Sequence, residues 1–217
     1  MKHRPPTTAE AEGVIKFELV FRRAEPPSHP CWPQLEGWRQ ILRHLELVGQ
    51  AEDRYQGLAY GNVSMRTGNG GFLISGTQTS GAARLAPTDY CQVESWDLRS
   101  NRIHAAGLVR PSSDALSHAA LYQARPEIGS VVHVHCPELW RKLIDGSLPL
   151  PATPADVPYG TPALALSLLD LVLNGHGPVL GLAGHEDGLI AFGAAPATAA
   201  SALLGLYAGV IARHDGT

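Results

Sequence analysis

Two histidines separated by one residue are the first feature of the sequence that could carry chemistry. His133 and His135 lie in a valine-rich run, 130–136, that is typical of a β-strand. Side chains alternate along a strand, so both imidazoles should point to one face, while Val132 and Val134 pack on the other. Two imidazoles on one face of a rigid strand form a preformed pair of metal ligands. In a chain with 10 histidines this spacing also arises by chance. A pair of metal ligands and a chance pair without a function are therefore both kept as interpretations.

A third histidine, His185, lies in the segment GHEDG between two short apolar runs. It is either a further metal ligand, brought in from the end of a neighbouring strand, or part of a solvated hairpin tip. Three other histidines lack a comparable setting and are predicted to be surface or capping residues. They are His104, His118 and His176.

A Ser-Ser-acid motif marks a predicted helix start. Ser112, Ser113 and Asp114 directly precede an alanine- and leucine-rich run. Free backbone N–H groups and hydroxyls at such a start can bind a phosphate or a carboxylate, and Asp114 would reach into the same pocket. The alternative is a serine N-cap followed by an acid that suits the helix dipole.

Two turns of small residues, 61–64 (GNVS) and 75–81 (SGTQTSG), are rich in hydrogen-bond donors. Their backbone amides could surround an anion, although ordinary turns have the same composition. Neither matches a P-loop or a dinucleotide-binding glycine motif.

The elements that must position these residues follow from hydrophobic periodicity and turn signals. Helices are predicted over 35–51, 113–123, 161–173 and 196–213. Strands are predicted over 14–21, 62–66, 72–75, 90–97, 102–106, 130–136, 179–183 and 188–192. This order indicates an α/β fold in which helices cover both faces of a mixed sheet.

Composition limits the function classes. The chain has 217 residues, a net charge of −3 and few lysines, which argues against a nucleic-acid partner. Three widely spaced cysteines and the lack of an apolar leader predict a cytoplasmic protein. The uncharged stretch 188–212 is long enough to span a membrane, but its alanines, glycines and Pro196 favour a buried strand, a turn and a helix. Residues 1–13 are predicted to be a flexible tail and 14–217 one domain.

The order of four motifs resembles the class II aldolase/adducin family. These are GNVSMR, LISGTQT, RPSSDALSHAALYQARPEIGSVVHVHC, and a histidine followed by GLIAFG, within 35–207. The resemblance, closest to ribulose-phosphate 4-epimerase and fuculose-phosphate aldolase, implies a three-layer α/β/α fold with a central mixed, largely antiparallel sheet. It also implies zinc, or another divalent ion such as Mn²⁺, Co²⁺ or Ni²⁺. A small-molecule substrate and a homotetramer with active sites between subunits are implied as well.

Carried over residue by residue, the resemblance assigns three groups of site residues. The metal ligands would be His133, His135 and His185, although two extra residues, Glu186 and Asp187, follow the third histidine. The substrate-binding residues would be Gly61, Asn62, Thr77, Ser112 and Ser113. Gln78 stands where the family commonly has glycine, and Ala59 where the aldolases have threonine.

The catalytic residues implied by the resemblance are two aspartates. Asp114 takes the place of the aldolases' glutamate, and the epimerase has aspartate there. Asp156 lies in a stretch similar to one that carries a catalytic aspartate in the epimerase. Family members also use a tyrosine from a C-terminal tail, which we expect to be missing here because the sequence stops soon after its last predicted helix.

The expected function is therefore a metal-dependent aldolase acting on a small, phosphorylated sugar or hydroxy-carbonyl compound. Bond cleavage next to a carbonyl passes through an enediolate, whose charge a divalent ion stabilises as a Lewis acid. Two alternatives remain open. One is a sugar-phosphate 4-epimerase that uses the same retro-aldol and aldol steps, and the other is a non-catalytic, adducin-like binding domain.

Overall fold

The computed structural model describes residues 13–25 and 29–214, so all of the predicted tail except Gly13 lies outside the described residues. Its centre is a nine-stranded sheet, in which only the β1/β7 and β9/β10 pairs are parallel. In spatial order the strands are β1 (Glu18–Arg23), β7 (Arg102–Gly107), β6 (Tyr90–Asp97), β5 (Phe72–Ser75), β4 (Asn62–Arg66), β8 (Ser130–His135), β11 (Gly188–Gly193), β10 (Val179–Leu182) and β9 (Ala152–Thr153). A small second sheet pairs β2 (Gly49–Gln50) with β3 (Ala59–Tyr60).

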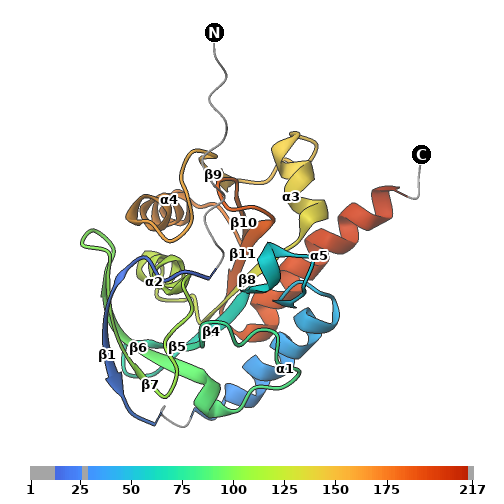
Figure 1. The fold of residues 1–217 in the computed structure, drawn as a ribbon. Coiled ribbons are helices and arrows are strands. Elements are labelled where there is room, and N and C mark those ends of the chain that lie inside the picture. The colour runs from blue at the N-terminus through green and yellow to red at the C-terminus, as the bar shows by residue number, and fades with distance from the viewer. Residues whose placement is uncertain (1–12, 26–28, 215–217) are drawn as a thin grey trace.

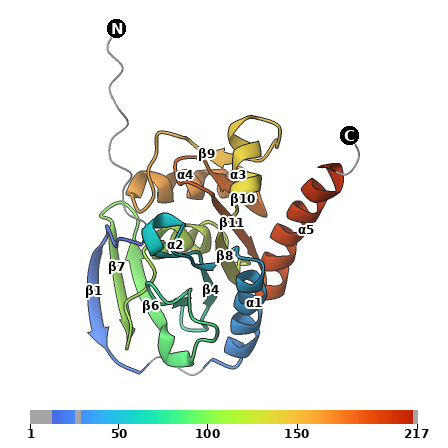
Figure 2. The same ribbon diagram turned by 45° about the vertical axis from the view of Figure 1, so that its right-hand side comes forward.

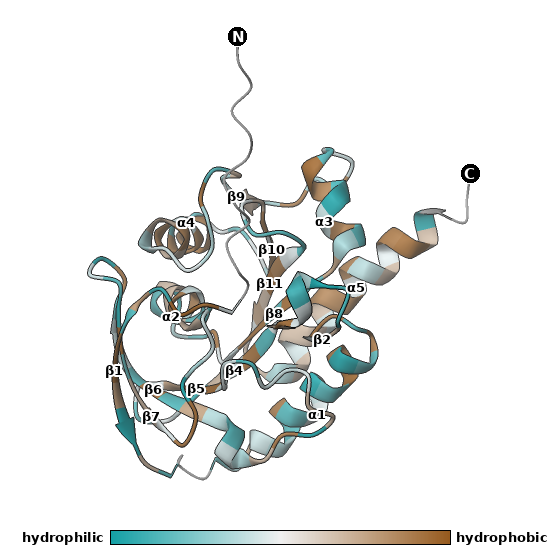
Figure 3. Ribbon diagram, viewed as in Figure 1, coloured by the Kyte–Doolittle hydropathy of each residue, from teal (hydrophilic) through white to brown (hydrophobic). Residues whose placement is uncertain are grey.

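Helices cover both faces of the large sheet, as Figures 1 and 2 show. On one face, α2 (Ala115–Ala124) and α4 (Pro162–Leu173) close a core with Val131 and Ile190 of the sheet. On the other face, α1 (Trp32–His44), α3 (Pro137–Ile144) and α5 (Pro196–His214) close a second core. In Figure 3 the apolar colour of the central strands marks the layer that these two cores bury. The predicted three-layer α/β/α fold with a mixed, largely antiparallel sheet is confirmed.

The register around β8 decides which residues meet at the site. β4 and β11 flank β8 on its two sides, both antiparallel, and Asn62 and Ile190 lie opposite His133. Directly opposed residues share a face of the sheet, so Asn62 and His133 point to the same side. Val132 and Val134 pack into the other core, as the alternation predicts.

Helix α1 differs from the prediction at its C-terminus. It ends at His44, well before the predicted end at 51, because Glu46 adopts a left-handed conformation with φ of 56°. The chain then folds back, and Leu47 N–H donates to Leu42 O at 2.9 Å. Buried Leu47 and Val48 continue the apolar pattern after the helix has ended, which explains the overestimate.

Several short elements were not predicted. They include β2 and β3 of the small sheet, α3, a short helix with Pro137 at its first turn, and β9, a two-residue edge strand. The uncharged stretch 188–212 forms β11 and most of α5, as predicted. Among the described residues, no helix is both long and apolar enough to cross a membrane.

Candidate metal and substrate site

The structure brings together the three histidines singled out from the sequence. His133, His135 and His185 are buried, and their ligand nitrogens all lie within 4.8 Å of one another. Nε2 of His133 and Nε2 of His135 are 3.2 Å apart. A tetrahedral ion with metal–nitrogen bonds of about 2.0–2.1 Å holds its ligand atoms roughly 3.3 Å apart. The cluster could therefore hold a divalent metal ion.

The surrounding chain orients one of these rings and keeps another one neutral. Nδ1 of His133 lies 3.0 Å from Leu189 O, and a proton on Nδ1 leaves the Nε2 lone pair facing the cluster. Burial is the largest cause that lowers the pKa of His135 well below its usual value, and the neighbouring His185 and His133 lower it further. Neutral imidazole is the form that binds a metal ion.

The residues that follow His185 do not displace it from the cluster. His185 N–H donates to Leu182 O at 3.0 Å, and Gly188 N–H donates to His185 O at 2.9 Å. Asp187 takes a left-handed conformation with φ of 62°, which lets this tight turn include the two additional residues. His185 is 3% exposed, which rules out the solvated hairpin tip.

Asp114 lies beside the histidines and does not cap its helix. It occupies the N-cap position of α2 without a side-chain capping bond. Its Oδ2 instead accepts a hydrogen bond from Asn62 Nδ2 at 2.8 Å and lies 3.8 Å from His133 Nε2. Burial alone would raise the pKa of Asp114, but the nearby histidines and Asn62 hold it below its ordinary value. A buried carboxylate thus faces the cluster.

One small polar cavity adjoins this carboxylate. The substrate-binding residues inferred from the sequence all line it, together with Asp114 and five neighbours. The lining consists of Gly13, Ala59, Gly61, Asn62, Gly76, Thr77, Gln78, Ser80, Ser112, Ser113 and Asp114. Gly61 has φ of 70°, and a Cβ there would lie 2.6 Å from a Val48 methyl group, so this turn requires glycine.

The two departures from the family pattern contact each other at this cavity. Gln78 Oε1 accepts a hydrogen bond from Ala59 N–H at 2.9 Å, and Gln78 Nε2 donates to Ala59 O at 3.4 Å. Gln78 has φ of 58°, a conformation that favours glycine. The same amide packs against Gly13, so the glutamine side chain narrows the cavity from one side.

Known proteins share the fold that carries this cluster. The family model described as Class II Aldolase and Adducin N-terminal domain matches residues 49–206. The chain belongs to this family. L-Fuculose-1-phosphate aldolase from Thermus thermophilus has the same fold, with a TM-score of 0.59 and 21% identity over 85% of this chain and 93% of that one. YgbL from Klebsiella pneumoniae, described as a candidate aldolase/epimerase/decarboxylase, has a TM-score of 0.61 and 20% identity, over 80% of this chain and 83% of that one.

Asp156 is not brought into the cluster in this class II aldolase family member. It lies in the turn that follows β9, and its side chain is exposed. The catalytic role inferred for it from the resemblance to the epimerase stays a prediction.

Sequence reasoning misplaced one histidine of this family member. His118, expected at the surface or at a cap, is fully buried. Its Nδ1 lies 2.7 Å from Ser64 Oγ, which in turn lies 2.8 Å from Tyr122 Oη. The signal was available: His118 follows Asp114 by four residues and so lies on the same face of α2.

Aromatic rings around the histidines were also missed. Tyr159 stacks on His185 with ring centroids 5.0 Å apart, and Lys16 Nζ lies 3.9 Å from the Tyr159 ring centroid. Tyr55 contacts His135 edge to face at 4.7 Å. These partners lie far away in the sequence, so no local pattern could have shown them.

The buried state of His118 predicts how stability depends on pH. Burial lowers its pKa from 6.5 to about 3, so between these values the unfolded chain binds a proton that the native protein does not. Stability is therefore lost as pH falls below about 6.5, by about 1.4 kcal/mol per pH unit. Urea unfolding at pH 7 and pH 5 should show this loss, and His118→Asn should lose about 2 kcal/mol less than the wild type. Equal losses in both proteins would contradict the assignment.

Proposed function

We propose that this protein is a divalent-metal-dependent lyase of the aldolase type. Its substrate would be a small sugar or sugar phosphate, cleaved between two oxygen-bearing carbons. The observation that carries the proposal is the placement of the Asp114 carboxylate 3.8 Å from His133 in a buried three-histidine cluster. Membership of the class II aldolase family and the fold of a fuculose-phosphate aldolase support it.

His133, His135 and His185 would hold the ion, with zinc as the first candidate and Mn²⁺, Co²⁺ or Ni²⁺ as alternatives that imidazole also binds. When bound, such an ion supplies Lewis-acid stabilisation of the negative charge that develops on a substrate carbonyl. The hydrogen bond from His133 Nδ1 to Leu189 O keeps one ligand ring in the orientation that this role needs.

The other residues would orient the substrate and move a proton. Asp114, kept ionised, can accept a proton from a substrate hydroxyl or carbon and return it later. Asn62 holds that carboxylate in place through the 2.8 Å hydrogen bond. The hydroxyls of Thr77, Ser112 and Ser113 line the neighbouring cavity and would bind the remote polar end of the substrate.

A sugar-phosphate 4-epimerase is the second candidate. The observation that favours it is the aspartate at position 114, because the epimerase has aspartate where the aldolases have glutamate. Both enzymes break the same carbon–carbon bond, but the epimerase rejoins the fragments. Release of two free fragments therefore supports the aldolase, whereas inversion at one carbon without release supports the epimerase. For either enzyme we propose a homotetramer with active sites between subunits.

An activity assay on Asp114→Asn tests the proposal. The first probe is L-fuculose 1-phosphate, whose cleavage between C3 and C4 releases dihydroxyacetone phosphate, with other ketose phosphates tested alongside it. Removing the proton acceptor should lower kcat by about 10²- to 10⁴-fold, without changing the metal content.

The matched control is Asp170→Asn, which neutralises an exposed carboxylate on α4 and should act like the wild type. Cleavage by Asp114→Asn at the wild-type rate would refute the assigned role.

A further inference from the structure

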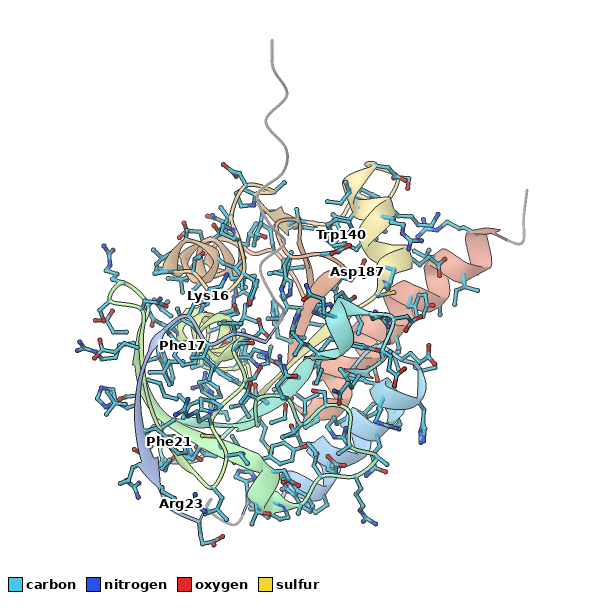
Figure 4. The ribbon with its side chains drawn as sticks, viewed as in Figure 1. Lys16, Phe17, Phe21, Arg23, Trp140 and Asp187 are labelled. Carbon is cyan, nitrogen blue, oxygen red and sulfur yellow. The ribbon has the colours of Figure 1, made fainter. Side chains whose placement is uncertain are left out.

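Two loops that are distant in the sequence are joined beside His135. Tyr55 belongs to η1 (Tyr55–Gly57), and Asp187 belongs to the turn between β10 and β11. The Tyr55 hydroxyl donates a hydrogen bond to Asp187 Oδ2 at 2.5 Å, across 132 residues of sequence. In Figure 4 the labelled Asp187 lies next to the short helical turn that carries Tyr55.

The backbone of Asp187 connects the segments that carry two of the three histidines. Asp187 follows His185 by two residues in one turn, and its carbonyl accepts a hydrogen bond from Cys136 N–H at 2.8 Å. Cys136 directly follows His135 at the end of β8. A shift of Asp187 would therefore change the position of His185 relative to His135.

The side of Tyr55 that faces the site supports His135 directly. The two rings are in edge-to-face contact, with centroids 4.7 Å apart and planes at 74°. Arg54 donates to Tyr55 Oη at 3.0 Å and to His135 O at 3.4 Å. The hydrogen bond to Asp187 thus fixes a ring that packs against a proposed ligand.

The backbone at both ends of this hydrogen bond is unfavourable for the residues present. Tyr55 has φ of 46°, and Asp187 has φ of 62°. Left-handed conformations of non-glycine residues cost energy and persist only where surrounding contacts hold them, typically at functional sites. The Tyr55–Asp187 hydrogen bond is a contact that stabilises both loops at once.

We propose that Tyr55 and Asp187 form a clamp that sets the position of His135 relative to His185, and with it the affinity for the divalent ion. Both are positioning residues, because they act through the histidines and do not bind the ion themselves. Asp187 is one of the two extra residues after His185, so the clamp belongs to this chain and not to the general family pattern. The inference rests on the proposed metal site.

Zinc affinity, measured by competition with a chromophoric chelator on the full-length protein, tests the clamp. Tyr55→Phe keeps the ring and removes only the hydroxyl, and Asp187→Ala removes the acceptor. Each should weaken Zn²⁺ binding by about 10- to 100-fold. The double variant should bind within about threefold of the weaker single variant, because both changes break the same interaction. The visible spectrum of the Co²⁺-loaded protein should change in Tyr55→Phe.

The matched control is Tyr60→Phe. Tyr60 also bonds Arg54, at 2.9 Å, but its ring centroid lies 5.6 Å from that of His135. The Zn²⁺ affinity of Tyr60→Phe should lie within about threefold of the wild-type affinity. Melting temperatures show whether each variant folds, and if Asp187→Ala does not fold, Tyr55→Phe decides the result.

Three outcomes would overturn the clamp, and they separate a failure of the clamp from a failure of the proposed function. Wild-type affinity in Tyr55→Phe, or strictly additive losses in the double variant, would refute the clamp and leave the proposed function intact. A wild-type protein that binds no divalent ion would refute the proposed function together with the clamp.

Discussion

Replacing His133 by alanine is expected to remove the bound divalent ion and to lower kcat/KM by more than about 10³-fold. His133 is completely buried, its Nε2 lies 3.2 Å from His135 Nε2, and the same atom lies 3.8 Å from Asp114 Oδ2. Its loss leaves two imidazoles, too few to retain an ion that is open to substrate. Metal analysis of protein purified without chelators, together with the cleavage assay, measures both effects.

The control for this prediction is His104→Ala. His104 lies on β7 with an exposed side chain, so its loss should change neither metal content nor rate. If His133→Ala retained one ion per chain and cleaved the substrate normally, the histidine cluster would not be the metal centre.

The second large effect concerns stability. Arg39→Met should lower the free energy of unfolding by about 3–5 kcal/mol, because it leaves the Glu36 carboxylate buried without its cation. Arg39 is 0% exposed and Glu36 3%, and the Arg39 Nε to Glu36 Oε2 distance is 2.7 Å. Since whole domains are stable by only about 5–15 kcal/mol, urea unfolding should detect this loss clearly.

The loss of the ion pair should also affect the proposed substrate cavity, because Arg39 and Glu36 hold the backbone of the loop 82–85. Arg39 donates to Ala82 O and Ala83 O, both at 3.2 Å, and Glu36 accepts from Leu85 N–H at 3.0 Å. These residues lie just beyond Thr77, which lines the cavity.

An exposed ion pair provides the comparison for Arg39→Met. Arg102 and Glu18 are 2.8 Å apart, but their side chains are 44% and 57% exposed. Arg102→Met should therefore cost less than about 1 kcal/mol. If both variants lost a similarly small free energy of unfolding, the buried ion pair would not stabilise the fold more than the exposed one.

Sequence periodicity was enough for the parts of the site that lie within one element. The alternation of 130–136 placed His133 and His135 on one face, since strand geometry leaves no other arrangement. The helix start at Ser112–Asp114 was found because proline and serine mark such starts. Local patterns left open whether Asp114 caps this helix, because the answer depends on its hydrogen bond with Asn62, 52 residues away.

The remainder of the site depends on pairings between distant strands. His185 joins the cluster because β11 pairs with β8 in one register, in which Gly188 lies opposite His135. Tyr55 and Asp187 lie 132 residues apart, so only the tertiary structure brings them together. The end of α1 was overestimated for a related reason, since buried Leu47 and Val48 satisfy the same apolar pattern from outside the helix.

The most direct test of the metal centre is anomalous diffraction at the zinc edge, from crystals grown without chelators and with Zn²⁺ added in a one-to-one ratio. We predict one strong peak per chain, bonded to nitrogen atoms of His133, His135 and His185. The absence of a peak at these three histidines, or a single peak bound by other residues, would contradict the proposed metal centre.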